Sequence, residues 1–201
     1  MHGRCTVSAL RALVLLSGGL DSVTVAQMML RRNELGACLI VDYGQPHARW
    51  EIPRAIKWCG VHGVKALHAD IPMLGGGGMR IGHGAAGPRV VPGRNLALIS
   101  LVVSAALAHG CNAVVVGCNA DDTAYYLDCR ASFITAANAT AGAYGIRVLA
   151  PLIGMTKRQV VGEALRVGVV IEDTWSCYEP QGPAPCGTCN ACRLRAAAIA
   201  G

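Results

Sequence analysis

A short polar turn, Ser17-Gly18-Gly19-Leu20-Asp21-Ser22, follows the apolar residues 13–16 and precedes an apolar stretch that begins at Val23. Glycines let a chain bend tightly and approach a ligand closely, and a helix that begins there directs free N–H groups at a bound anion. The turn contains no lysine, so it lacks the G-x-x-x-x-G-K-S/T pattern of kinase and GTPase loops. The residues predict a phosphate-binding loop of another kind; the alternative is an ordinary turn capped by Asp21 or Ser22.

Four cysteines near the C-terminus form a second candidate site. Cys177, Cys186, Cys189 and Cys192 stand in a C-x8-C-x2-C-x2-C arrangement. Four thiolates at this spacing favour a tetrahedral zinc ion with a structural role, because no ligand position is left open for water or substrate. Disulfides and an iron–sulfur cluster are the alternatives. The other six cysteines are dispersed and fit small buried apolar positions: Cys5, Cys38, Cys59, Cys111, Cys118 and Cys129.

Length and composition predict one soluble domain, with a small appendage, in a chain of 201 residues. The net charge of +6 comes from 18 basic and 12 acidic residues. The arginines are scattered, which favours an anionic small molecule as ligand and argues against direct nucleic-acid binding. The longest apolar stretch, residues 96–108, is shorter than the ~18 residues that cross a membrane. Residues 1–5 do not begin a secretory signal, so we expect a cytoplasmic protein.

The elements that must position these sites alternate between strand and helix. We predict strands at residues 13–16, 39–41, 64–68, 113–116 and 147–149, and helices at 23–31, 49–58 and 96–108. Thr156 and Gln159 form a capping box that opens a further helix, which Gly168 ends. This alternation is typical of an α/β fold with a doubly wound parallel sheet.

The polar segments of the chain follow the predicted strands. Residues 17–22, 42–45, 117–122 and 150–152 come after strands one, two, four and five. Ligands of such sheets bind beyond the carboxyl ends of the strands, so we expect these segments to converge at one edge. The glycine-rich residues 75–88 are predicted to form a mobile flap.

In this order, the motifs resemble the 7-cyano-7-deazaguanine synthase (QueC) family, within the ATP-pyrophosphatase (PP-loop) superfamily, over nearly the whole chain. The cysteine spacing is similar to the family's zinc pattern. Residues 124–127 depart from it, since Tyr125 and Leu127 stand where the family has glycine and proline, and Pro46 replaces a usual arginine. The matching segments are residues 17–22, Asp42-Tyr43-Gly44-Gln45 with His47 and Glu51, residues 91–95, Tyr126 with Asp128-Cys129-Arg130, Pro151-Leu152, and residues 177–195.

The resemblance implies an adenine nucleotide alpha hydrolase-like domain at residues 1–172 and a zinc-binding element at residues 173–201. It implies an ATP-dependent ligase that converts 7-carboxy-7-deazaguanine and ammonia into 7-cyano-7-deazaguanine, with Mg²⁺ and a structural Zn²⁺, as a cytoplasmic homodimer without membrane or nucleic-acid partners. Three alternatives stay open. The enzyme adenylates a related 7-deazaguanine or another carboxylate, it is a thiouridine-type or amide-forming enzyme, or it is a catalytically silent nucleotide-binding subunit.

The resemblance also implies roles for individual residues. Asp21, Ser17 and Arg94 are the expected catalytic residues, and Asn95 is expected to cap the helix that follows. A loop-stabilising ion pair between Asp128 and Arg130 is the alternative to their role in the substrate pocket. The nucleotide site is expected to consist of Leu16, Ser17, Gly18, Gly19, Leu20, Asp21, Ser22, Tyr43 and Arg94, the substrate pocket of Asp122, Tyr126, Asp128 and Arg130, and the metal site of Cys177, Cys186, Cys189 and Cys192.

Overall fold

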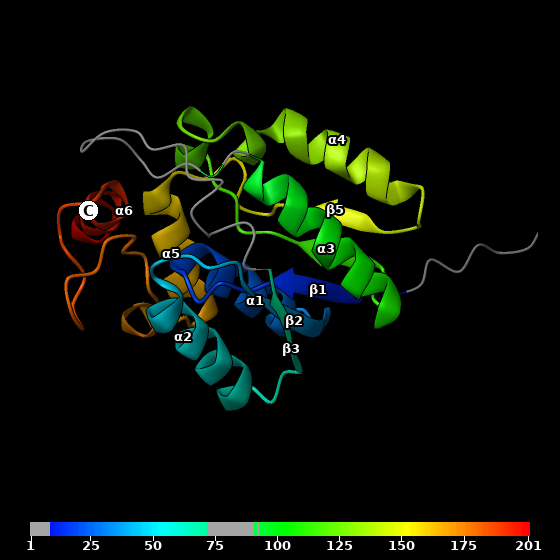
Figure 1. Cartoon of the computed structure of the whole chain (residues 1–201), viewed down its shortest axis with the longest axis horizontal. Helices are drawn as coiled ribbons and strands as arrows, with labels where there is room; N and C mark the ends of the chain where they lie inside the picture. The colour runs from blue at the N-terminus through cyan, green and yellow to red at the C-terminus, as the bar shows by residue number, and fades with distance from the viewer. Residues whose placement is uncertain (1–8, 72–90, 92) are drawn as a thin grey trace, which may run out of the picture.

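The computed structural model, which describes residues 9–71, 91 and 93–201, has a central parallel sheet with helices on both faces (Figure 1). The sheet order is β3-β2-β1-β4-β5, and every neighbouring pair is parallel. The predicted doubly wound α/β fold is confirmed. The strands are β1 (Ala12–Leu15), β2 (Leu35–Asp42), β3 (Ala66–Asp70), β4 (Ala113–Val115) and β5 (Arg147–Leu149).

Alternating residues of the strands enter two separate cores, because successive side chains point to opposite faces of a sheet. Ala12 and Val14 of β1 lie in one core, and Leu13 lies in the other. The first core is covered by α1 (Leu20–Arg31), α2 (Ala48–Val61), α5 (Lys157–Val167) and α6 (Asn190–Ala200), and the second by α3 (Arg94–Ala108) and α4 (Ala131–Gly142).

Two helices were not anticipated from the sequence, and several boundaries differ. The structure adds α4 and α6, and β2 is longer than the predicted residues 39–41. Helix α1 begins at Leu20, so its first turn contains Asp21. Short 3-10 turns, η2 (Asp121–Ala124), η3 (Leu127–Cys129) and η4 (Ile171–Asp173), complete the described elements. The predicted flap at residues 75–88, Pro92 and Cys5 lie outside the described residues.

Helix α5 begins and ends as predicted. The Thr156 hydroxyl accepts the Gln159 N–H at 3.3 Å, and the Gln159 side chain accepts the Thr156 N–H at 2.8 Å. Gly168 ends the helix with φ of +85°, which favours glycine. The capping box fixes the start of α5, which follows β5 after residues 150–156.

The start of α3 is capped differently from the prediction. The Asp128 carboxylate accepts the Asn95 N–H at 2.8 Å, while the Asn95 side chain donates to the Asp128 carbonyl at 3.2 Å. The prediction that Asn95 caps this helix is therefore wrong. Asp128, which comes from η3, satisfies an N–H group that has no partner inside the helix.

None of the helices in the described part of the chain is both long enough and apolar enough to span a membrane.

Candidate functional site

A pocket of about 210 Å³ opens where the ends of β1 and β4 lie side by side. The sheet order changes direction at this pair, and ligands of open α/β sheets bind at such a switch point. Most predicted nucleotide and substrate residues line the pocket, whereas Gly18, Asp128 and Arg130 are not among its lining residues. The predicted residues in its wall are Leu16, Ser17, Gly19, Leu20, Asp21, Ser22, Tyr43, Arg94, Asp122 and Tyr126.

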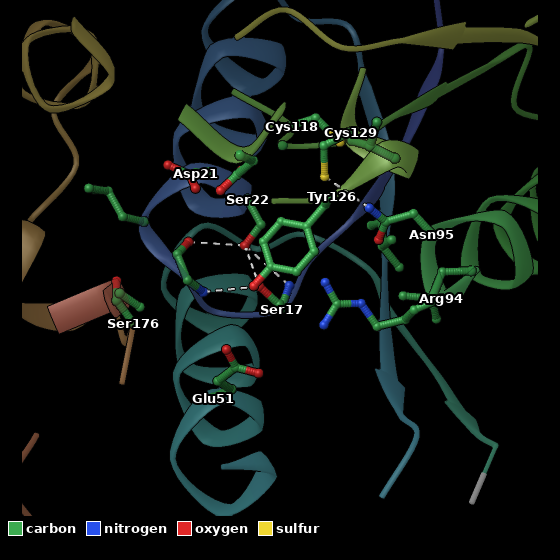
Figure 2. Close-up of a pocket in the computed structure, with 18 of the residues that line it drawn as sticks. Ser17, Asp21, Ser22, Glu51, Arg94, Asn95, Cys118, Tyr126, Cys129 and Ser176 are labelled. Carbon is green, nitrogen blue, oxygen red and sulfur yellow. Dashed lines mark hydrogen bonds between the residues drawn. The ribbon is translucent and has the colours of Figure 1, made fainter. Parts of the chain in front are cut away.

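Hydrogen bonds within the loop between β1 and α1 hold it in place at the wall of the pocket. Ser22 Oγ lies 3.0 Å from Ser17 Oγ and donates to the Gly19 carbonyl at 3.0 Å, and the Gly19 N–H donates to Ser17 Oγ at 3.2 Å (Figure 2). Gly19 is the N-cap of α1 and no side chain caps this helix, so the alternative of a turn capped by Asp21 or Ser22 is not found. Amides at a helix start remain available to an anion.

Gly18 faces away from the pocket, against α2. Its φ is +86°, and a Cβ added to it would lie 2.3 Å from the Glu51 carbonyl oxygen. A side chain at this position would strain the backbone and push α2 away from the loop. Gly18 therefore shapes the loop instead of lining the pocket.

A cluster of charged and amide groups surrounds Asp21. The Lys157 ammonium lies 2.6 and 2.8 Å from its two carboxylate oxygens. The Asn119 side chain donates to Asp21 at 3.2 Å and to Asp122 at 2.7 Å. Burial, together with the charge of Asp21, raises the pKa of Asp122 to about 6. Carboxylate oxygens are ligands that Mg²⁺ prefers, so Asp21 is suited to a divalent cation in exchange for its contact with the Lys157 ammonium.

Arg94 provides positive charge on another side of the pocket. It reaches toward the loop from the first turn of α3, with Tyr126 and Ser17 nearby (Figure 2). Its guanidinium donates to the Tyr43 hydroxyl at 3.2 Å. Burial raises the pKa of Tyr43, which keeps this phenol neutral as an acceptor. A positioned guanidinium facing a loop of amides is suited to a phosphate group.

Three buried polar side chains follow β2 at the floor of the pocket: Gln45, His47 and Glu51. His47 Nε2 lies 3.4 Å from a Glu51 carboxylate oxygen. Burial raises the pKa of Glu51 to about 8, so its carboxyl is mostly protonated at neutral pH. A neutral Glu51 beside the loop does not repel a bound phosphate.

The predicted substrate residues divide into two groups. Asp122 and Tyr126 line the pocket. Asp128 instead caps α3, and Arg130 donates to the Thr123 carbonyl at 3.3 Å. No ion pair joins Asp128 to Arg130 in the described chain, so the structure does not show the alternative interpretation either.

Tyr125 and Leu127, which depart from the family pattern, differ in their position relative to the pocket. Tyr125 lines the pocket with 48% of its surface exposed, whereas Leu127 is 70% exposed and is not a lining residue. Of the two replacements, Tyr125 is the one placed to affect what the pocket accepts.

The four C-terminal cysteines converge as predicted, and their Sγ atoms all lie within 4.8 Å of one another. A single tetrahedral zinc ion with Zn–S bonds of ~2.3 Å places its sulfurs ~3.8 Å apart. Cys186 and Cys192 Sγ are 4.0 Å apart. The Cys189 N–H donates to Cys186 Sγ at 3.3 Å and lowers the pKa of that thiol to about 6. The donor set fits a metal ion. The other described cysteines are buried and free, as expected.

Sequence reasoning missed Lys157 and Asn119 and assigned no role to the C-terminal residues of the pocket wall. The capping box at Thr156 was the available signal for Lys157, because it placed the next residue at the start of a helix beyond the sheet edge. The C-terminal lining residues carry no comparable pattern: Trp175, Ser176, Tyr178, Asn190, Ala191 and Leu194.

Comparison with known proteins identifies the family to which this chain is similar. The model of the family described as "Queuosine biosynthesis protein QueC" matches residues 11–201. The chain is 37% identical to the 7-cyano-7-deazaguanine synthase of Synechococcus sp. (strain CC9605), over 94% of this chain and 92% of that protein. It is 33% identical to the protein of the same name from Anaeromyxobacter dehalogenans (strain 2CP-C), over 96% of this chain and 92% of that protein.

Solved structures agree on the fold. The U34-tRNA thiolase NcsA from Methanococcus maripaludis, which contains a 4Fe–4S cluster, matches with a TM-score of 0.57 at 16% identity, over 94% of this chain and 64% of the thiolase. The NMN synthetase from Francisella tularensis matches with a TM-score of 0.56 at 16% identity, over 90% of this chain and 71% of the synthetase. At this identity the likeness concerns the fold alone.

Proposed function

The chain belongs to the QueC family, and from this premise we propose that it uses ATP to convert 7-carboxy-7-deazaguanine and ammonia into 7-cyano-7-deazaguanine. The observation that carries the proposal is the convergence of the loop amides, Asp21 and Arg94 on one pocket at the switch point of the sheet. The relatives at 33–37% identity are enzymes named for this product.

The first step activates the acid. A carboxylate is a poor electrophile, so its oxygen attacks the α-phosphorus of ATP and pyrophosphate leaves. Ammonia then attacks the carbonyl carbon of the acyl adenylate, AMP departs with the carboxylate oxygen, and the released proton passes to solvent. The product is the amide.

The second step removes the remaining oxygen. The amide oxygen attacks the α-phosphorus of a second ATP, and pyrophosphate leaves again. Loss of AMP and of the protons on nitrogen gives the nitrile. In both steps an oxygen on the same carbon of the substrate attacks the α-phosphorus of an ATP molecule. One adenylating pocket therefore serves both steps.

The pocket residues are assigned to these steps by position. The amides and hydroxyls of residues 17–22 bind the leaving pyrophosphate, with Gly18 shaping the loop. Asp21 would hold Mg²⁺, and the ion would supply positive charge to the phosphates. Lys157 adds a fixed cation on the same side, and Arg94 faces the transferred phosphate from the other.

The base of the substrate is assigned to the Asp122 and Tyr126 side of the pocket. A guanine-like edge presents N–H donors, which a carboxylate accepts. Asp128 and Arg130 are not among the lining residues, so we propose substrate contacts for Asp122 and Tyr126 alone.

The metal of the C-terminal element is proposed to be zinc. Cys177, Cys186, Cys189 and Cys192 hold their sulfurs close enough for one ion, whereas the thiolates of a cluster bind different irons and stand farther apart. Residues 173–201 form the zinc-binding element, because Trp175, Cys177 and Cys192 form a small core of their own. Zinc there stabilises the fold and takes no part in the chemistry.

One observation favours a second candidate, a ligase for a related 7-deazaguanine or another carboxylate. Tyr125 stands in the pocket wall, where its ring reduces the room beside Tyr126, at a ring separation of 6.5 Å. A changed pocket volume affects the acid that is accepted more than the adenylation itself.

Incubation of the purified protein with ATP, ammonium and 7-carboxy-7-deazaguanine tests the proposal. Formation of AMP, pyrophosphate and the nitrile supports it. AMP formation that requires a different carboxylate supports the second candidate, and no AMP with any acid supports a silent nucleotide-binding subunit.

A further inference from the structure

The segment of residues 174–178, here called the wall segment, joins the metal site to the phosphate-binding loop. It contains the metal ligand Cys177 and the buried Trp175. The Trp175 N–H donates to the Gly18 carbonyl at 3.0 Å, and the Trp175 carbonyl oxygen lies 3.3 Å from where a Cβ of Gly19 would stand. Trp175 therefore contacts both glycines of the loop.

The bond from Trp175 fixes the direction of a neighbouring amide. In a trans peptide the C=O and the N–H of the same unit point to opposite sides. Because the Gly18 carbonyl points to Trp175, the Gly19 N–H of that peptide unit points away from Trp175. It donates to Ser17 Oγ at 3.2 Å, at the wall of the pocket.

Arg195 holds the wall segment from helix α6. Its guanidinium donates to the hydroxyls on both sides of Trp175, to Thr174 at 2.7 Å and to Ser176 at 3.1 Å, and to the Ile171 carbonyl at 2.6 Å. The metal ligand Cys192 lies one turn earlier on the same helix. A metal ion that binds Cys177 and Cys192 therefore fixes the wall segment and α6 relative to each other.

The ring of Trp175 ties the same segment to α2. It stacks on Trp50, with ring centroids 5.7 Å apart and an interplanar angle of 11°, and the Arg54 guanidinium lies 4.6 Å from its centroid. Its indole N–H donates to the Cys177 carbonyl at 2.8 Å. Trp50 and Trp175 also pack against the four cysteines. The ring thus contacts the metal site while the backbone of the same residue contacts the loop.

We propose that the metal site positions the phosphate-binding loop at Gly18 and Gly19 through Trp175 and Arg195, so that metal occupancy and nucleotide binding strengthen each other. The inference rests on the proposed function, because it assigns the loop to nucleotide phosphates. Reciprocity is required by linkage: a metal that improves nucleotide binding is itself held more tightly when nucleotide is bound.

The first experiment needs no mutation. The zinc-loaded protein is mixed with an excess chelator, and zinc release is followed with and without saturating α,β-methylene-ATP and Mg²⁺. We expect nucleotide to slow zinc release about 10-fold or more. If calorimetry shows nucleotide binding while release keeps its rate, the coupling is wrong and the proposed function stands. If calorimetry shows no nucleotide binding, both are wrong.

The second experiment tests the path through α6. Arg195→Met removes the three hydrogen bonds and keeps most of the aliphatic stem, and Arg193→Met is the matched control on the exposed side of the same helix. With zinc saturating, we expect Arg195→Met to weaken binding of α,β-methylene-ATP about 10-fold and to lose most of the effect of nucleotide on zinc release. The control stays within twofold of the wild type. An Arg195→Met protein with wild-type affinity and wild-type coupling would overturn the inference.

Discussion

Asp21 is held by two side chains that come from distant parts of the chain. It stands in the first turn of α1, and its partners Lys157 and Asn119 come from positions 136 and 98 residues away. The ion pair is partly buried, with 14% of the Lys157 side chain and 20% of the Asp21 side chain exposed. The fold therefore places a carboxylate and an ammonium together in the pocket where the phosphates of ATP are proposed to bind.

Replacement of Asp21 by asparagine tests its role in adenylation. We expect Asp21→Asn to lower AMP formation ~100-fold or more, because loss of one group that stabilises developing charge has effects of this size. Zinc content should stay at the wild-type level, since the four cysteines lie in a separate cluster. AMP is measured by chromatography and zinc by mass spectrometry. Turnover at the wild-type rate would contradict the assignment of the loop.

Replacement of Lys157 by glutamine tests the residue that the sequence did not reveal. We expect kcat/KM for ATP to fall about 10- to 100-fold in Lys157→Gln, with partial recovery in Lys157→Arg. Lys57→Gln is the control. It removes the exposed ion pair between Lys57 and Asp173, and exposed ion pairs contribute little. Equal activities of Lys157→Gln and the control would exclude a role for Lys157.

The sequence predicted the residues of this site to different extents. The cysteines were predictable because Cys186, Cys189 and Cys192 are spaced so closely that local turns bring them together. The capping box placed Lys157 at the start of a helix, but it did not predict the contact with Asp21, because that contact depends on how α5 packs against α1. Asp128 was expected in the substrate pocket and instead accepts a hydrogen bond at the start of α3, because nothing in its local sequence distinguishes a carboxylate that binds a ligand from one that caps a helix.

At the scale of elements, the start of α3 matters because it carries Arg94 into the pocket. Gly93 is its N-cap, with φ of +68°, and the cap has no side-chain hydrogen bond of its own. The Asp128 carboxylate from η3 supplies the missing acceptor. The helix that presents Arg94 is thus anchored by the residue that sequence reasoning had assigned to the substrate.

Removal of this cap separates the two interpretations of Asp128. We expect Asp128→Ala to lower the free energy of unfolding by about 1 kcal/mol, the usual effect of losing a helix cap. Denaturant unfolding measures this loss, and Asp128→Asn, which keeps an acceptor oxygen, should recover part of it. KM for the deazaguanine acid should change little. A stable variant with a greatly raised KM would return Asp128 to the substrate pocket.

The strands were predictable because buried parallel strands are short apolar runs, and β1, β4 and β5 match their predicted positions within one residue. Helix α4 was missed because Phe133 and Ile134 are its only large apolar residues, so alanines complete the stripe that it turns to the core. Helix α6 was missed because its N-cap is Cys189, one of the four clustered cysteines, so its start depends on tertiary structure. Local sequence determines the first group of elements, and packing determines the second.

At the scale of the whole molecule, burial of Glu51 links stability to pH. Its pKa is raised from 4.5 to about 8 in the folded state, so the folded protein binds more protons than the unfolded chain between these values. Stability therefore falls as pH rises through this window. Between pH 6 and pH 8 the loss amounts to about 2 kcal/mol.

Glu51→Gln removes this titration. We expect the free energy of unfolding of the variant, measured with saturating zinc, to depend less on pH between 6 and 8 than that of the wild type. The difference between the two proteins isolates Glu51 from thiol protonation at the metal site, which they share. Parallel pH profiles would show that Glu51 is ionised in the folded protein.

The homodimer implied by the family resemblance stays a prediction, and we propose a surface without charge as its interface. Residues 95–120 and 131–146, which include most of α3 and all of α4, contain no lysine, arginine, aspartate or glutamate. Leu107 and Tyr144 are 45% and 65% exposed on this face. Symmetric interfaces place a surface against its own copy, so an uncharged face avoids repulsion.

Sedimentation of variants tests this surface. We expect the wild type to sediment as a dimer and Leu107→Glu to shift it toward the monomer, because the change places like charges in the interface. Leu165→Glu is the control, since Leu165 is 61% exposed on α5, which covers the opposite face of the sheet. If Leu165→Glu dissociates the dimer and Leu107→Glu does not, the interface lies on the other face.

The central claim is that a carbonyl oxygen of the substrate attacks the α-phosphorus of ATP in the pocket beside residues 17–22. The most direct test supplies 7-carboxy-7-deazaguanine with both carboxylate oxygens replaced by ¹⁸O, and analyses the products by mass spectrometry. We expect two AMP molecules for each nitrile, each with one ¹⁸O in its phosphate. Nitrile formed with unlabelled AMP, and with the ¹⁸O found in water or pyrophosphate, would contradict it.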